Sequence, residues 1–178
     1  MNIIINENNL ELKDINEFNS KVRAILINEN NQILVCKYGE TYLLPGGKID
    51  ENESKINALI RELNEETGMF YKEEEFNYFC ELNYYQKDYP KRDTNIKLNR
   101  LITTYYYIGK LKEINLEKQT LTEKEKKSNF TLELINLSEL ETIIKNNINS
   151  NPRNIYFQKE LLTLLEHIKK HSIYTTSL

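Results

Sequence analysis

The chain has 178 residues and a formal net charge of −3, with 24 basic and 27 acidic side chains. This length is enough for one compact domain with a hydrophobic core, and the charged fraction of mixed sign excludes a long disordered chain. A protein that binds nucleic acid through general electrostatics is usually basic, so this balance argues against nucleic acid as a partner.

The apolar residues bear on location and on redox state. No apolar run approaches the ~20 residues needed to cross a bilayer, so we expect no membrane association. The first residues, MNIIINE, lack the basic segment of a signal peptide, and we therefore expect a cytoplasmic protein. Cys36 and Cys80 each lie in an apolar, strand-like run, which predicts two buried, reduced thiols and no disulfide.

The first third of the chain has the pattern of short strands. Residues 1–19 are polar with scattered Ile and Leu, and we expect a short strand or an arm laid on the domain. Residues 21–27 and 32–38 are rich in aliphatic side chains and flank a turn signal, which predicts a hairpin. Residues 41–44 form a third extended run, which ends at the Pro45-Gly46-Gly47 turn.

A helix is predicted over residues 54–67. One face is apolar because four aliphatic residues recur at helical spacing, namely Ile56, Leu59, Ile60 and Leu63. Ser54 can cap the amino end, and Gly68 stands where a carboxy-terminal glycine stop belongs.

Strands and then helices are predicted in the rest of the chain. We expect long strands at 76–85 and 98–109, a loop at 86–97, a charged loop at 110–129 and a last strand at 130–135. A Ser138-Glu141 capping-box pattern predicts a helix to about Asn147.

A final helix is expected at about 153–171. The order of elements favours an α+β fold, layered α/β/α, with a mixed central β-sheet flanked by helices. We expect residues 1–178 to form a single domain.

Three carboxylates gather near the end of the predicted first helix. Glu62, Glu65 and Glu66 lie at i, i+3 and i+4, so they share a helix face and repel one another. They also lie at the helix end where the macrodipole disfavours anions. A hard divalent cation such as Mg²⁺ or Mn²⁺ would remove both conflicts. The alternative is a solvated acidic face without a ligand.

Arg61 stands directly before this cluster and eight residues after Glu53, so it could orient a carboxylate through a bidentate pair.

The whole segment from Gly47 to Met69 resembles the Nudix box, Gly-x5-Glu-x7-Arg-Glu-U-x-Glu-Glu-x-Gly-U, where U is bulky and aliphatic. Every fixed position matches, with Leu63 and Met69 at the U sites. Tyr42 stands where the family often has Trp. The resemblance extends over roughly residues 21–140.

The resemblance implies a metal-dependent hydrolase that cleaves a diphosphate linkage in a nucleoside diphosphate derivative, by attack of water on phosphorus. It implies a metal site made by Glu62, Glu65 and Glu66 beside the main chain of Gly47. Glu53 and Arg61 would shape this site. The alternative is a Nudix-like module that binds a nucleotide without turnover, and the resemblance also allows a homodimer.

The general base and the substrate contacts are less sharply indicated. The family often adds an acidic residue from a later loop, and the loop at 110–129 offers Glu113, Glu117, Glu123 and Glu125. We choose Glu125, with Glu65 as the base if these four are only solvated charges. Arg23 and Lys37 on the first hairpin could contact phosphates, and Tyr85 could stack on a base. The alternative for Arg23 and Lys37 is that they are solvated charges on strands. The alternative for Tyr85 is that it belongs to the hydrophobic core.

Overall fold

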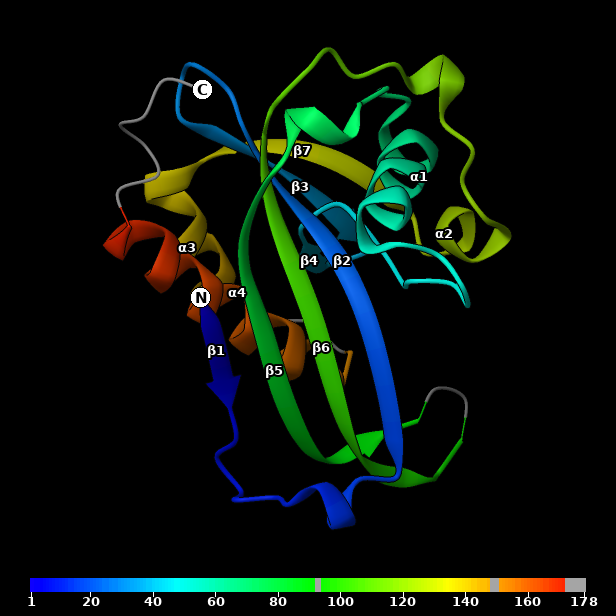
Figure 1. Ribbon diagram of the computed structural model, residues 1–178, viewed down its shortest axis with the longest axis vertical. Coiled ribbons are helices and arrows are strands. Elements are labelled where there is room, and N and C mark those ends of the chain that lie inside the picture. Colours follow the sequence, from blue (N-terminus) through cyan, green and yellow to red (C-terminus); the bar gives the residue numbers. More distant parts are fainter. Residues whose placement is uncertain (92–93, 148–150, 172–178) are drawn as a thin grey trace.

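The computed structural model describes residues 1–91, 94–147 and 151–171. Its strands are β1 (Asn2–Ile5), β2 (Glu17–Ile27), β3 (Gln32–Tyr38), β4 (Thr41–Leu43), β5 (Asn77–Pro90), β6 (Lys97–Lys110) and β7 (Phe130–Asn136). Its α-helices are α1 (Lys55–Thr67), α2 (Glu123–Lys127), α3 (Leu137–Asn146) and α4 (Asn154–Lys170), as Figure 1 shows.

The strands form one mixed sheet in the order β1-β5-β6-β2-β3-β4, with β7 paired to β3. β2 and β6 run parallel along their whole shared length, from Glu17 opposite Arg100 to Ile27 opposite Lys110. β5 and β6 form an antiparallel hairpin. The expected β2–β3 hairpin is present, but only Ile27 and Ile33 pair across it. The rest of β3 pairs with other strands: all of it with β7, and its last three residues with β4 as well.

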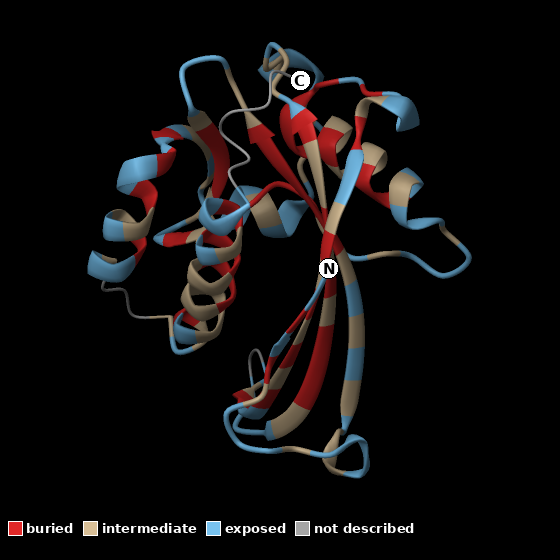
Figure 2. Cartoon of the chain, turned by 60° about the vertical axis from the view of Figure 1, so that its left-hand side comes forward, coloured by how far each residue is buried: buried red, intermediate tan, exposed pale blue. Residues whose placement is uncertain are grey.

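Helices cover both faces of the sheet, which confirms the α/β/α expectation. On one face α1 packs Leu59 and Leu63 against Val22 and Leu26 of β2. On the opposite face α3 and α4 cover a second core that includes Leu164. Figure 2 shows the buried residues on the strands and on the helix faces that meet them. Among the described residues, no helix is both long and apolar enough to cross a membrane.

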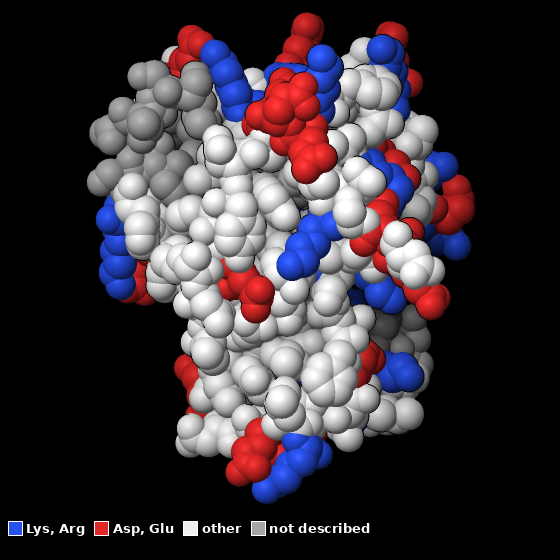
Figure 3. All heavy atoms as spheres, in the orientation of Figure 1, with Lys and Arg blue, Asp and Glu red and all other residues white. Residues whose placement is uncertain are grey.

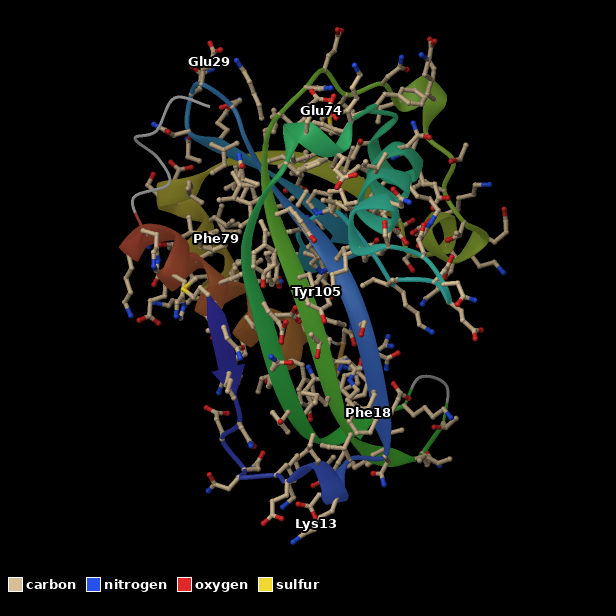
Figure 4. The ribbon with its side chains drawn as sticks, in the orientation of Figure 1. Lys13, Phe18, Glu29, Glu74, Phe79 and Tyr105 are labelled. Atoms are coloured by element: carbon tan, nitrogen blue, oxygen red, sulfur yellow. The ribbon has the colours of Figure 1, made fainter. Side chains whose placement is uncertain are left out.

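The α1 face of the sheet is covered at one end only. Beyond α1, the long strands carry few charged side chains (Figure 3). Phe18 lies near the far end of β2 and is 62% exposed, while Tyr105 lies nearer to α1 (Figure 4). Lys55 at the start of α1 places its Nζ 3.5 Å from the centroid of the Tyr105 ring, which marks the border of the covered half.

Several expected boundaries agree with the structure. α1 begins after Ser54, whose hydroxyl accepts a hydrogen bond from the Asn57 main chain, and it ends at Gly68 with φ +67°. The expected arm at 1–19 contains β1, which lies parallel to β5 at the sheet edge, and its last residues already belong to β2. The two cysteines are buried and unpaired, as expected.

Other boundaries differ. The loop expected at 86–97 is shorter because β5 continues to Pro90, where buried Tyr89 packs on Tyr156 of α4 with ring centroids 5.1 Å apart. The charged segment after β6 contains α2, which is opened by a Thr122 cap. α3 begins at Leu137, so Ser138 lies inside the helix and cannot cap it; Glu141 instead pairs with Lys145.

Candidate active site

The glycine turn after β4 lies along β2 and extends the sheet there. The Ala24 main chain donates to the Pro45 carbonyl at 2.9 Å, and the Val22 main chain donates to the Gly47 carbonyl at 3.0 Å. Gly46 has φ +127°, and a Cβ added to it would overlap the Val22 carbonyl oxygen and lie 2.8 Å from the Cα of Arg23. Only glycine therefore fits at this point, and its amide faces the end of α1.

Glu66 points from α1 into this turn and is 1% exposed. Its Oε2 accepts a hydrogen bond from the Gly46 amide at 2.7 Å, and its Oε1 accepts one from the Tyr38 hydroxyl at 2.6 Å. The Cys36 thiol lies 3.7 Å from Oε2. The carboxylate thus has two strong donors that come from two different segments of the chain.

Burial dominates the electrostatics of this group. It raises the pKa of Glu66 to about 7, although the hydrogen bonds from Tyr38 and Gly46 and the charge of Arg23 act to lower it. Burial and the adjacent Glu66 charge raise the pKa of Tyr38, so its hydroxyl stays a neutral donor. The same causes raise the pKa of Cys36 and keep it a thiol.

Arg61 organises the exposed side of α1. It forms a bidentate pair with Glu53, Nε to Oε1 at 2.9 Å and Nη2 to Oε2 at 2.8 Å. Its Nη1 also donates to Glu62 at 2.8 Å and to Glu65 at 3.4 Å, and its Nη2 donates to the Lys48 carbonyl at 3.2 Å. The Arg61 hydrogen bond lowers the pKa of Glu53, which stays ionised.

The three carboxylates in the last two turns of α1 have different surroundings. Glu62 lies against Gly47, where a Cβ would overlap its carboxyl group, and its side chain is 14% exposed. Glu65 is the most open, with a side chain that is 38% exposed. Glu66 faces inward. Within the described ranges, no three acidic, histidine or cysteine side chains converge in a metal-holding arrangement. Glu62 and Glu65 instead converge on the Arg61 guanidinium.

The donor chemistry nevertheless suits a hard cation. Glu62 and Glu65 offer carboxylate oxygens, the donors that Mg²⁺ and Mn²⁺ prefer. The position between them already accommodates positive charge, since Nη1 of Arg61 contacts both carboxylates. Arg61 could release this contact and keep its bidentate hold on Glu53. The residues present therefore fit a divalent cation.

Two residues expected to contact substrate are Arg23, which lies buried beside the glycine turn, and Tyr85. Arg23 is not a solvated hairpin charge: it is 6% exposed, and its Nη1 donates to the carbonyls of Leu44 and Gly46. The turn laid along β2 buries it, so it braces that turn. Tyr85 lies on β5, and β6 separates that strand from β2 in the sheet.

Lys37 and Glu125 are engaged with neighbours. Lys37 pairs with Glu133 at 3.4 Å, and its Nζ lies 5.2 Å from the centroid of the Tyr42 ring. Glu125 is half-buried, and its carboxylate accepts hydrogen bonds at 2.7 Å from both the amide and the hydroxyl of Thr122. It therefore caps its own helix.

Sequence reasoning missed Tyr38 and the burial of Glu66. A signal for the burial was present: Glu66 lies three residues after Leu63 and seven after Leu59, so it continues the apolar stripe of the helix. For Tyr38, strand alternation places it on the same face of β3 as Cys36. Nothing local indicates that this face meets Glu66.

Comparisons with known proteins identify the family and the fold. The family model described as the NUDIX domain matches residues 17–156. An RNA pyrophosphohydrolase of Ruthia magnifica subsp. Calyptogena magnifica is 36% identical over 61 residues, covering 33% of this chain and 34% of that protein. A putative 8-oxo-dGTP diphosphatase of Bacillus subtilis (strain 168) is 48% identical over 47 residues, covering 25% of this chain and 32% of that protein. The chain thus spans about a third of the length of these relatives.

Solved structures share the fold. The MutT protein of Methanosarcina mazei Go1 superposes with a TM-score of 0.53 at 16% identity, covering 90% of this chain and 99% of that one. The Ap4A hydrolase of C. elegans, in a binary complex, superposes with a TM-score of 0.51 at 13% identity, covering 85% and 96%. At these identities the likeness shows the fold alone.

Proposed function

Since the chain belongs to the Nudix family, we propose that it is a metal-dependent pyrophosphohydrolase that cleaves a diphosphate linkage in a small nucleoside diphosphate derivative. The observation that carries this proposal is the Arg61 guanidinium, which is fixed on Glu53 and contacts Glu62 and Glu65 together. This arrangement brings four ionisable residues of the matched motif together, and Glu66 reaches the glycine turn separately, through the Gly46 amide.

The proposed cofactor is Mg²⁺, with Mn²⁺ as a substitute. Glu62, Glu65 and Glu66 would hold it beside the main chain of Gly47, and Glu66 would do so through the lone pairs that Gly46 and Tyr38 leave free. When bound, the cation would neutralise the diphosphate and make a water molecule more acidic.

Side chains of the protein would hold Arg61 in place and accept the proton of the attacking water. Glu53 holds Arg61 through Nε and Nη2. The guanidinium would therefore stay in the site even if Nη1 of Arg61 lost its contacts with Glu62 and Glu65. Glu65 is the best-placed proton acceptor for the attacking water, because its side chain is the most exposed of the three and its nearest cation lies at 3.4 Å. Glu125 is the alternative base, but it would first have to leave the Thr122 cap.

The proposed substrate class is broad. The relatives and the structural neighbour are named RNA pyrophosphohydrolase, putative 8-oxo-dGTP diphosphatase and Ap4A hydrolase. Both 8-oxo-dGTP and Ap4A contain phosphoanhydride bonds, the kind of bond that a pyrophosphohydrolase cleaves. Lys37 remains a candidate phosphate contact, since its partner Glu133 lies at the surface. Arg23 supports the site through the main chain rather than through the substrate. Tyr85 is no longer favoured as a base-stacking residue.

The test is a product-identified screen with Mg²⁺ against ADP-ribose, dinucleoside polyphosphates, nucleotide sugars and nucleoside triphosphates. We expect one class to yield phosphate-bearing products. Glu66→Gln should lower that rate by orders of magnitude, whereas the matched control Glu29→Gln, an exposed pair with Lys110, should leave it unchanged. An unchanged rate in Glu66→Gln would contradict the assignment.

A nucleotide-binding module without turnover is the second candidate. The observation that favours it is the separation of the three carboxylates, since Glu66 faces inward while Glu65 faces solvent. Tight binding of a nucleotide sugar with no product after long incubation in Mg²⁺ or Mn²⁺ would support this candidate over the hydrolase.

A further inference from the structure

We propose that Tyr38 is a positioning residue whose hydroxyl fixes the Glu66 carboxylate for binding of the divalent cation. The inference rests on the proposed function and concerns a residue outside the Gly47 to Met69 segment. The Tyr38 hydroxyl donates to Oε1 at 2.6 Å, while the Gly46 amide donates to Oε2 at 2.7 Å. Two donors, one on each oxygen, fix both the position of the carboxylate and its rotation about the last side-chain bond.

The hydroxyl is itself rigidly placed. Tyr38 is the last residue of β3, where it pairs with Thr41 of β4 on one side and with Phe130 of β7 on the other. Its ring meets the Phe130 ring edge to face, with centroids 5.0 Å apart and an interplanar angle of 76°. Strand pairing and ring packing therefore hold the hydroxyl in place independently of Glu66.

Within the part of the chain that the structure describes, no other group donates a hydrogen bond to Oε1 of Glu66. Glu66 is 1% exposed, so water has little access to Oε1 if the hydroxyl is removed. The Cys36 thiol approaches Oε2, the oxygen that Gly46 already binds, and a thiol is a weak donor. Without Tyr38 the carboxylate would keep one strong hydrogen bond and could rotate about it. Hydrogen bonds to ligating carboxylates orient them in this way in metal sites.

The test compares Tyr38→Phe with Tyr71→Phe. Both substitutions delete a hydroxyl that donates one hydrogen bond, because Tyr71 donates to the Lys110 carbonyl at 2.9 Å. Mn²⁺ binding is measured by electron paramagnetic resonance, without substrate. We expect Tyr38→Phe to weaken Mn²⁺ binding by about 10- to 100-fold, and Tyr71→Phe to change it by less than about twofold. Thermal unfolding in chelator reports the loss of stability in each variant.

Activity gives a second readout. In Tyr38→Phe the Mg²⁺ concentration for half-maximal rate should rise in parallel with the Mn²⁺ dissociation constant, while kcat at saturating Mg²⁺ recovers most of its value. In a Glu66→Gln background, Tyr38→Phe should have no further effect on Mn²⁺ binding, because the hydroxyl acts through that carboxylate.

The outcomes separate the two proposals. Equal Mn²⁺ affinity in wild type and Tyr38→Phe overturns the positioning role and leaves the proposed function standing. The positioning role is also overturned if Tyr38→Phe weakens Mn²⁺ binding as much in the Glu66→Gln background as it does in the wild-type protein. Absence of Mn²⁺ binding by the wild-type protein overturns both.

Discussion

Gly47 lies directly against the carboxyl group of Glu62, so that a Cβ on Gly47 would overlap all three carboxyl atoms. The clash concerns the end of a flexible side chain and not the backbone. We therefore expect Gly47→Ala to fold normally while Glu62 rotates away from the turn. Thermal unfolding should shift by only a few degrees, and activity should fall at least about tenfold, as for a displaced ligand. A variant that keeps full activity would show that the position of Glu62 is not required.

Gly46→Ala should behave in the opposite way and destabilise the fold. Gly46 has φ +127°, and its added Cβ would overlap the Val22 main chain. Backbone strain and overpacking together predict a loss of about 3 kcal/mol or more in the free energy of unfolding. The control is Gly39→Ala, where φ is +62° and the nearest atom, the Ser128 carbonyl oxygen, lies at 3.6 Å. Urea unfolding should show the smaller loss for Gly39→Ala.

The pKa of Glu66 predicts how stability depends on pH in metal-free protein. Burial raises this pKa from 4.5 to about 7 on folding, so the folded protein binds the proton more tightly than the unfolded chain. The free energy of unfolding should therefore fall as pH rises from about 4.5 to about 7, by about 3 kcal/mol from this group.

Glu66→Gln tests this assignment, because the amide can accept from Gly46 and carries no charge. In chelator above pH 7 the variant should be more stable than wild type, and the difference should vanish near pH 4. Equal pH dependence of the two proteins in urea unfolding would show that Glu66 does not titrate in this range.

The general base can be identified from single substitutions in two elements. We expect Glu65→Gln to lower kcat by about 100-fold or more, in the range of general base catalysis, with little change in folding. Glu125→Gln should lower stability slightly through the Thr122 cap and leave kcat nearly unchanged. If Glu125→Gln instead lowers the single-turnover rate more than Glu65→Gln does, the general base is Glu125 of α2.

The sequence by itself determined the elements that depend on near neighbours. α1 has its predicted ends because Ser54 and Gly68 act on main-chain groups within four residues, and its apolar stripe is visible in the spacing. The Gly47 to Met69 pattern likewise indicated the ionisable residues of the candidate site. β5 exceeded its predicted length because a contact between Tyr89 and Tyr156 of α4, far along the chain, keeps it extended.

Only the tertiary structure decided what each box carboxylate faces. Helical spacing places Glu62, Glu65 and Glu66 close together, but the donors to Glu66 come from residues 20 and 28 positions away. Arg23 was expected to contact phosphates or to be a solvated strand charge, and it is buried because the Pro45 to Gly47 turn lies along β2. Caps and periodicity act within a few residues and can be seen in the sequence. Hydrogen bonds between distant segments exist only once the sheet and helix have packed. Helical spacing puts Glu66 on the buried stripe of α1, and the packing decided that Tyr38 and Gly46 meet it there.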